Sequence, residues 1–432
     1  MAKGSVRKKG KKWYYRFYVE DASGNLVQKE CVGTESKSGT EKLLRQAMDD
    51  YEKKKFVAKS QNVTLAELLD EWVEEELKTS TLSNGTVTTY ITAVNQIKKH
   101  PIGNRKLKSI TAEHLQNYMD LLTFGGTYPD GKVKKGYSKD YVHSYSAVLQ
   151  KAFRYAVVPK NLITFNPMQY VVLKRKNEEV ELFADCTETD TETKPINHTQ
   201  YKILMNYLEE RNKPAILPVQ IAYFTGLRLG EVCGLIWQDI NLEEQYLTVR
   251  RSIRYNSVRH KWEIGPTKRK KVRIVDFGDT LTEILKKAKK EQRKQRFQYG
   301  ELYSRNYYKE VREKNRVYYE LYHLSGTEDV PADYTELSLV CIRPDGCYES
   351  PNTVELVCRT ARKRIPELER FHFHALRHTY TSNLLSNGAA PKDVQELLGH
   401  SDVSTTMNVY AHATREAKRK SAKLLDKVAG ID

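Results

Sequence analysis

The chain has 432 residues, which is long enough for two or three domains that each bury a core of their own. Lysine and arginine outnumber aspartate and glutamate by 72 to 55, so the net charge of +17 favours a polyanionic partner, with nucleic acid first. No stretch approaches the roughly 18 consecutive apolar residues that a membrane-spanning helix needs, which argues against a membrane protein.

Cysteine usage and the first residues favour a cytoplasmic protein. The segment Met1 to Lys12 is basic and no apolar stretch follows it, so we expect no secretory signal. The six cysteines lack paired Cys-x-x-Cys spacing, which argues against a zinc site and against a disulfide framework. We expect all six to be reduced and most of them to lie in the core: Cys31, Cys186, Cys233, Cys341, Cys347 and Cys358.

The first segment of the chain predicts a small sheet and a helix. Apolar and polar residues alternate over residues 13–20, as in a half-buried strand, and residues 26–32 predict a second strand. Ser38 and Glu41 form a capping-box pattern that opens a helix toward Lys55. The basic residues of this sheet either contact DNA or form a solvated surface, and the pattern alone leaves both interpretations open.

A helical block follows. Thr64 and Glu67 form another capping box, and apolar residues then recur at helical spacing. Three more helices are predicted over residues 86–99, 111–122 and 138–157. We therefore expect an all-helical block from about Val63 to Leu173.

One motif inside this block imitates a phosphate-binding loop. Residues 126–132 match most of a P-loop, but Val133 stands where serine or threonine is required, and no strand clearly precedes the motif. A turn between two helices explains Pro129-Asp130-Gly131 better.

The last part of the chain predicts a mixed domain. Residues 177–193 are acidic, rich in threonine and poor in apolar residues, as a linker is, so we place a boundary near residue 195. Helical patterns then dominate, but residues 246–254 and 271–277 are rich in β-branched and aromatic residues. These two segments flank a turn expected at Gly265-Pro266 and predict a small antiparallel sheet.

A charged helical run is expected from Leu281 through about Leu324. Its tyrosines either pack against the protein or stack on nucleic acid, and helical spacing favours packing. They are Tyr303, Tyr307, Tyr308, Tyr318, Tyr319 and Tyr322.

The residues that carry chemistry occur in a fixed order. His374 and Arg377 are followed by His400 and, ten residues later, by Tyr410, while Arg228 lies far upstream. Each of them alone has a structural explanation, such as a helix end at the glycine before His400. Their joint order favours attack on a phosphodiester by a side chain.

Tyrosine can replace the leaving oxygen of a cleaved DNA strand and so conserve the phosphodiester in a covalent bond. Because its phenol has an ordinary pKa near 10, Tyr410 needs positive charge or a proton acceptor nearby. On a helix, His374 and Arg377 present to one face about 5 to 6 Å apart, which suits two groups that converge on one phosphate. Arg228 and Arg377 can bracket the phosphate, since the planar guanidinium makes paired hydrogen bonds to its oxygens.

The departing 5′ oxygen needs a proton donor. Lys268 lies in the proposed turn and is a candidate, but Arg269, Lys270 and Lys271 are its neighbours, and composition alone does not choose among them.

Taken together, these motifs resemble those of the tyrosine recombinase (phage integrase) family, in particular integrases of phages and of integrative conjugative elements or conjugative transposons. Residues 225–231 resemble the first arginine box of the family, and residues 374–379 resemble the second. Residues 398–400 resemble its histidine or tryptophan position, and residues 409–410 resemble its nucleophile position.

The resemblance implies a role for each residue. Arg228 and Arg377 would bind the scissile phosphate, His374 and His400 would assist by hydrogen bonding and proton transfer, and Tyr410 would form a 3′-phosphotyrosine. Lysine at position 268, preceded by threonine as in the family, would protonate the 5′ leaving oxygen. The resemblance implies neither a metal nor another cofactor such as ATP.

The resemblance also implies a multidomain, mainly α fold with small β-sheets. A three-stranded sheet plus helix would bind arm-type DNA sites, an all-helical SAM-like domain would bind the core site, and a mixed α+β domain would be catalytic. The expected division is an arm-binding domain at 1–57, a core-binding domain at 62–173, a linker at 174–195, and a catalytic domain at 196–432 with a charged insertion near 278–334 and a protomer-docking tail at 411–432.

The expected function is therefore site-specific DNA recombination that integrates and excises a mobile genetic element. The expected partners are double-stranded DNA at core and arm sites, an excisionase and a host DNA-bending protein. The chain is expected to assemble as a homotetramer on DNA. Two alternatives remain: a type IB topoisomerase with the same chemistry, and a non-catalytic DNA-binding regulator. A regulator would have little reason to keep the six catalytic residues together.

Overall fold

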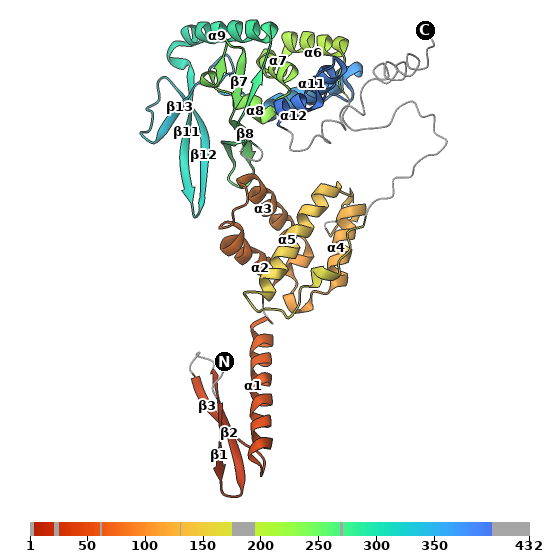
Figure 1. The fold of residues 1–432 in the computed structure, drawn as a ribbon, viewed down its shortest axis with the longest axis vertical. Helices are drawn as coiled ribbons and strands as arrows, with labels where there is room; N and C mark the ends of the chain where they lie inside the picture. The colour runs from red at the N-terminus through yellow and green to blue at the C-terminus, as the bar shows by residue number, and fades with distance from the viewer. Residues whose placement is uncertain are drawn as a thin grey trace, which may run out of the picture. The chain divides into compact units, whose positions relative to one another are not determined.

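The computed structural model describes residues 4–20, 26–60, 63–129, 131–174, 195–267 and 271–399. The chain divides into two units, Met1–Val180 and Glu181–Asp432 (Figure 1). Both contain helices and small antiparallel sheets, which agrees with the expected fold class. Over the described ranges, no helix is long and apolar enough to span a bilayer. The finer division of the chain into four segments stays a prediction.

The first unit begins with three strands and one helix. β1 (Gly4–Lys9), β2 (Lys12–Glu20) and β3 (Leu26–Val32) form an antiparallel sheet in that order, and α1 (Lys37–Ser60) packs against β1 and β2. Phe17 is buried, and its ring centroid lies 6.1 Å from that of Tyr51 on α1. Both predicted strands are present, because alternation gives the sheet one face that the helix can cover.

The predicted start of α1 was slightly wrong. The helix begins at Lys37, and the backbone N–H of Gly39 donates to Oγ of Ser36 at 3.0 Å. Ser36 therefore satisfies a free donor of the first turn, which is the task that the sequence pattern had given to Ser38.

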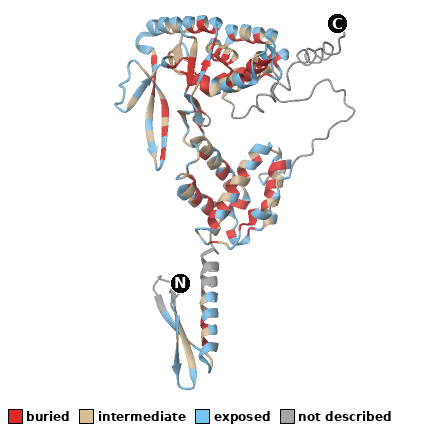
Figure 2. Cartoon of the chain, in the orientation of Figure 1, coloured by how far each residue is buried: buried red, intermediate tan, exposed pale blue. Residues whose placement is uncertain are grey.

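Four longer helices and one small hairpin make up the rest of the first unit. The helices are α2 (Leu65–Trp72), α3 (Asn84–Lys99), α4 (Ala112–Phe124) and α5 (Lys139–Val157). The capping box of Thr64 and Glu67 is confirmed, with both reciprocal bonds formed. Figure 2 shows buried residues along these helices, where Trp72, Leu149 and Phe153 are among the most deeply buried.

The block is not entirely helical. β4 (Gly125–Thr127) and β5 (Val133–Lys135) pair between α4 and α5, and the segment that imitates a P-loop connects them. The backbone N–H of Gly131 donates to the carbonyl of Tyr128 at 2.8 Å, which is the turn expected for this segment.

The second unit places helices around a three-stranded sheet. The helices are α6 (His198–Arg211), α7 (Ile216–Thr225), α8 (Leu229–Cys233), α9 (Asp279–Tyr299), α10 (Pro351–Arg364), α11 (Ala375–Ser386) and α12 (Pro391–Leu398). The sheet has the order β10-β7-β6, from β6 (Ile240–Asn241), β7 (Tyr246–Val249) and β10 (Arg273–Asp276). Its central residues Leu247 and Val275 are buried in the same core as α7 and α11.

The expected turn at Gly265-Pro266 was wrong. β8 (Arg251–Asn256) pairs with β9 (Lys261–Pro266), so the turn of this hairpin lies at residues 257–260 and Gly265-Pro266 ends a strand. His260 adopts a left-handed φ of 54° in that turn. The connection that carries Lys268 follows β9 and leads to β10.

The expected helical run to Leu324 was also wrong. α9 ends at Tyr299, and a long hairpin follows, formed by β11 (Ser304–Glu313) and β12 (Arg316–Ser325). With β13 (Tyr334–Leu337) and the β8–β9 hairpin they form a five-stranded sheet in the order β13-β11-β12-β9-β8. A two-residue turn at Lys314-Asn315, with φ of 52° at Lys314, reverses the chain.

The tyrosines of this segment pack, as their pattern favoured, but on a sheet. Tyr307 and Tyr318 are buried, and Tyr308, Tyr319 and Tyr322 are half-buried. The guanidinium carbon of Arg259 lies 4.3 Å from the ring centroid of Tyr318, which ties the β8–β9 turn to β12.

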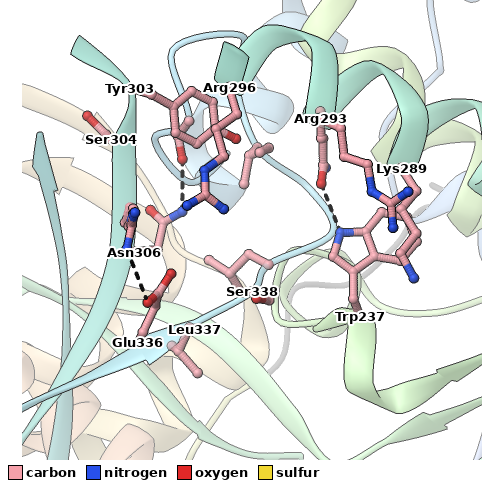
Figure 3. Close-up of a pocket in the computed structure, with 15 residues that line it drawn as sticks. Trp237, Lys289, Arg293, Arg296, Tyr303, Ser304, Asn306, Glu336, Leu337 and Ser338 are labelled. Carbon is pink, nitrogen blue, oxygen red and sulfur yellow. Dashed lines mark hydrogen bonds and ion pairs between the residues drawn. The ribbon is translucent and has the colours of Figure 1, made fainter. Parts of the chain in front are cut away.

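The β11–β12 hairpin meets α9 at a basic pocket of about 220 Å³ (Figure 3). Nε1 of Trp237 donates to Oε1 of Gln292 at 2.8 Å, and Nε2 of Gln292 donates to the carbonyl of Val340 at 2.7 Å. Asn306 on β11 is buried and donates to the carbonyl of Gly346 at 2.8 Å. These bonds join α9 and β11 to neighbouring segments of the second unit.

Candidate active site

Arg228 is positioned by a sharp change of chain direction. α7 ends at Thr225, and Gly226 follows with a left-handed φ of 64°. A Cβ at Gly226 would stand 2.6 Å from the ring of Tyr380 and 2.8 Å from a methyl carbon of Leu398, so only glycine fits here. Arg228 then occupies the N-cap of α8 with about a third of its side chain exposed, 32%.

Two arginines share one buried carboxylate behind this position. Glu231 is 2% exposed and accepts from Nη1 of Arg228 at 3.1 Å and from Nη2 of Arg273 at 2.7 Å. Burial alone would raise the pKa of Glu231, but the hydrogen bond and charge of Arg273, together with Arg228, lower the pKa below its ordinary value. Glu231 is therefore ionised and holds both guanidinium groups in place.

Arg377 is held by two backbone carbonyls. It is 3% exposed, and its Nη1 donates to the carbonyl of Gly226 and its Nη2 to that of Leu398, both at 2.7 Å. Burial and the positive charge of Arg228 lower the pKa of Arg377 to about 9, so the guanidinium is still charged at neutral pH.

His374 immediately precedes α11, and part of the residue is exposed to solvent while its ring lies among protein atoms. The protein atoms around its ring, then the positive charges of His378, Arg377, His372 and Arg228, lower the pKa of His374 to about 3. The imidazole is therefore neutral in the absence of an anion, and it can both donate and accept a hydrogen bond. His374 stands at the N-cap with right-handed helical dihedrals, and Arg377 lies three residues later in the first turn, so the predicted i, i+3 relation is kept at the start of α11.

The structure thus brings together three of the six predicted residues, from segments up to 149 positions apart: Arg228, His374 and Arg377. With Arg273 the described part of the site carries three guanidinium groups against one carboxylate, Glu231. This excess of positive charge, partly buried, suits a phosphate diester whose charge grows in a transition state.

The other three predicted residues, Lys268, His400 and Tyr410, lie outside the described residues. The structure does describe residues next to two of them, Thr267 before Lys268 and Gly399 before His400. Thr267 is buried and its Oγ1 donates to the carbonyl of Lys271 at 2.5 Å, which closes the connection that carries Lys268. Gly399, with a left-handed φ of 67°, ends α12 directly before His400.

Sequence reasoning missed Arg273. Its Nε donates to the carbonyl of Leu397 at 3.0 Å while its guanidinium binds Glu231, so it joins α12 to the first arginine segment. Arg273 comes soon after the basic run at 268–271, and only its position on the strand β10 distinguishes it from those basic residues. An alternation pattern over β10 places Arg273 and Val275 on one face, and that is the signal that was available.

Comparison with protein families identifies the family of the chain. The model of the phage integrase family matches residues 194–417, more than half of the chain. The chain belongs to the phage integrase family. A second model, the N-terminal SAM-like domain of phage integrases, matches residues 64–122. The phage integrase family comprises tyrosine recombinases, enzymes that cut and rejoin DNA strands, so the family and the enzyme class expected from the sequence are confirmed.

Two curated relatives align with most of the chain. A XerC-like tyrosine recombinase from Caldanaerobacter subterraneus subsp. tengcongensis is 26% identical over 446 aligned residues, which cover 99% of both chains. The prophage integrase IntR of Escherichia coli strain K12 is 25% identical, covering 90% of this chain and 85% of its own.

Solved structures show the same fold at lower identity. The integrase of transposon Tn1549, in complex with transposon right end DNA, superposes with a TM-score of 0.56 at 16% identity, covering 84% of this chain and 99% of that one. A lambda integrase dimer bound to a COC′ core site gives a TM-score of 0.52 at 17% identity, covering 94% of each chain.

Proposed function

We propose that this recombinase integrates and excises a mobile genetic element by cutting and rejoining DNA at specific sites. The observation that carries the proposal is the clustering of Arg228, His374 and Arg377, where positive charge exceeds negative charge. The family model that matches the chain also extends over Tyr410. The Tn1549 and prophage integrases among its relatives, which are named for mobile elements, support this role.

In this proposal Arg228 and Arg377 bind the non-bridging oxygens of the scissile phosphate. Arg377 is the more rigid of the two, because its bonds to the carbonyls of Gly226 and Leu398 fix its plane. Tyr410 attacks the phosphorus, a 3′-phosphotyrosine forms, and the 5′ oxygen leaves with a proton from Lys268. The 5′-hydroxyl of a partner strand later attacks the phosphotyrosine and releases Tyr410.

His374 and His400 act through hydrogen bonds to the same phosphate. A neutral His374 can donate one proton to a phosphate oxygen and accept another from the tyrosine hydroxyl. Binding of the anion would also offset the positive charges that lower the pKa of His374, so its basicity rises when DNA is present. The chemistry that these residues supply involves neither a metal nor ATP.

The remaining regions supply DNA sites and assembly. We assign residues 62–173 to the core site and residues 1–57 to arm sites, where the sheet exposes Lys8, Lys12 and Lys29 beside half-buried Arg16. We assign the tail at 411–432 to contact between protomers in a tetramer. An excisionase and a host DNA-bending protein would set direction, and the enzyme would work in the cytoplasm, where the chromosome is.

A type IB topoisomerase would share this chemistry but would act on one duplex. The three-stranded sheet with α1 favours recombination, because such a sheet would bind a second DNA site. Relaxation of one duplex needs no second site. Supercoiled DNA without attachment sites distinguishes the two, because a topoisomerase relaxes it at many positions and a recombinase does not.

The test of the proposed chemistry is covalent trapping. On a nicked suicide substrate that carries the attachment site, the full chain should form a protein–DNA adduct that resists denaturation. Tyr410→Phe should bind the same DNA with unchanged affinity and form no adduct. An adduct that survives this substitution would remove Tyr410 as the nucleophile.

A separate test addresses the arm-binding role. Removal of residues 1–57 should leave cleavage at the core site intact and reduce integration. The affinity of the full chain for DNA should fall steeply with salt, since each phosphate contact releases counterions. Equal integration by the truncated and full chains would refute the assignment of the sheet to arm sites.

A further inference from the structure

A pocket of about 290 Å³ opens in the helical part of the first unit, where α3 ends and the β4–β5 hairpin joins α4 to α5. It is smaller than the roughly 300 to 1,000 Å³ of sites for drug-sized ligands, so it suits a single ring system. Five tyrosines and a histidine line it together with two lysines: Tyr118, Tyr128, Tyr137, Tyr141, Tyr145, His100, Lys99 and Lys134.

Three of the tyrosines contact one another in a row. Tyr137 stacks on Tyr141 with ring centroids 4.3 Å apart and an interplanar angle of 26°, and Tyr145 follows at 4.8 Å from Tyr141. The hydroxyl groups of Tyr141 and Tyr145 are hydrogen-bonded at 2.7 Å. Tyr145 and Tyr118 are buried at the base, whereas Tyr137 and Tyr141 are half-buried and offer ring surface to a ligand.

The rim is basic. Nζ of Lys134 lies 4.3 Å from the ring centroid of Tyr128, and Lys99 is exposed at the end of α3. None of the described residues that line the pocket is acidic. Lys132 and Lys135 on the same hairpin are also exposed and add to the positive field.

This combination of rings and charge selects one class of ligand. Tyrosine cages without basic residues attract cations over the ring faces, but lysines at the rim repel a cation. They attract a phosphate instead, while the ring faces take a flat aromatic group. Aromatic surfaces in a basic groove are how proteins hold the bases of single-stranded nucleic acid.

We propose that this tyrosine pocket holds an unpaired nucleobase of the DNA strand during recombination, with Lys99 and Lys134 on the flanking phosphates. The inference rests on the proposed function, because a strand that has been cut must leave its complement before it can join another duplex. Its bases are then unstacked, and stacking on Tyr137 and Tyr141 offsets the cost of unpairing. The phenol groups stay neutral there, since burial raises the pKa of Tyr118 and of Tyr145 well above the ordinary value.

The test compares single strands that differ only in their bases. Fluorescence anisotropy would give the affinity of the full chain for a single-stranded oligonucleotide of about 12 nucleotides and for the same strand with abasic sites. We expect the base-containing strand to bind about tenfold more tightly. Tyr137→Leu and Tyr141→Leu should remove this preference and leave binding of the abasic strand unchanged.

Tyr90→Leu is the matched control, because Tyr90 is a half-buried tyrosine of the same helical part that does not line the pocket. It should keep the tenfold preference, and thermal melting would confirm that all three variants fold. Equal affinity of the wild type for both strands would overturn the proposal, as would equal loss of preference in the control. Displacement of the oligonucleotide by an equal concentration of free deoxynucleotide would also overturn it, since the occupant would then not be a strand.

Covalent trapping on the suicide substrate separates this inference from the proposed function. An adduct formed without any base preference would reject the pocket assignment and leave the recombinase chemistry standing. Failure of the adduct with the base preference intact would reject the chemistry instead.

Discussion

Arg377 donates a hydrogen bond from Nη2 to the carbonyl of Leu398 at 2.7 Å. Leu398 is two residues before His400, so the second arginine of the site also fixes the backbone from which the histidine and the nucleophile segment continue. Arg273 reinforces the same end of α12 through the carbonyl of Leu397. Arg377 and Arg273, of which Arg377 binds phosphate in the proposed function, are therefore both joined to the end of α12 through two adjacent carbonyls.

Substitution of Arg377 tests this coupling. Arg377→Lys keeps a positive charge but cannot reach both the Gly226 and Leu398 carbonyls with one planar group. We expect adduct formation on a suicide substrate to slow by about 10² to 10³, the usual effect of losing one transition-state donor. DNA affinity should change little. Arg211→Lys, an exposed arginine on α6, is the control, and equal rates for both variants would contradict the role of the carbonyl bonds.

The pairing of buried Glu231 with Arg273 predicts how substitutions at these two positions change the free energy of unfolding. Arg273→Met leaves Glu231 buried with one partner fewer, which should cost about 3 kcal/mol in the free energy of unfolding. Adding Glu231→Gln removes the uncompensated charge, so the double variant should regain part of that loss. Urea unfolding followed by tryptophan fluorescence measures both. A double variant less stable than Arg273→Met would show that Glu231 is not the group left unpaired.

Gly226 should tolerate no side chain. Gly226→Ala places a Cβ at a φ of 64° and 2.6 Å from the ring of Tyr380, so strain and overpacking should together cost about 2 to 4 kcal/mol. Gly278→Ala is the matched control, since that position has a φ of −96° and nothing within 4 Å of the added atom. Thermal melting should show a lower Tm for Gly226→Ala alone, and similar values for the two variants would contradict the steric argument.

His374 predicts how stability depends on pH. Its pKa is lowered from 6.5 to about 3 in the folded protein, so the unfolded chain takes up this proton first as the pH falls. The native state therefore keeps its full stability from this group above pH 6.5 and loses it progressively as the pH falls toward 3. Acidification from about pH 7.5 to 5 should destabilise the wild type more than His374→Asn, as measured by urea unfolding. An equal loss in both proteins would mean that His374 is not the titrating group.

The β11–β12 hairpin depends on an ionic network around Arg259. Arg259 bonds Glu313 at 2.5 Å and Glu320 at 2.6 Å, and its Nε lies 3.8 Å from Glu263, which is 1% exposed. Arg259→Met removes the cation that buried Glu320 shares with half-exposed Glu313, and leaves buried Glu263 with Arg254 alone, so it should cost about 3 kcal/mol. Limited proteolysis should then cut within residues 304–325 before other sites. Arg312→Met, on the exposed part of β11, should leave the cleavage pattern unchanged.

The helices of the first unit were accessible from sequence because their signals are local. The capping box at Thr64 and Glu67 fixes a start by bonds between residues three apart, and the apolar spacing behind it fixes the buried face. The hairpin at 304–325 was missed for the same reason: its charged residues favour a helix locally, while pairing with β9 and β13 and burial of Tyr307 and Tyr318 favour strands.

The sequence by itself predicted the family of the chain and the candidate site residues in their order, because the spacing of arginine, histidine and tyrosine is a property of the chain alone. Only the tertiary structure decided how the arginines are held. Glu231, Arg273 and the carbonyls of Gly226 and Leu398 converge from three separate segments. Hydrogen bonds of a buried guanidinium depend on distances between distant parts of the chain, and no local pattern encodes those distances.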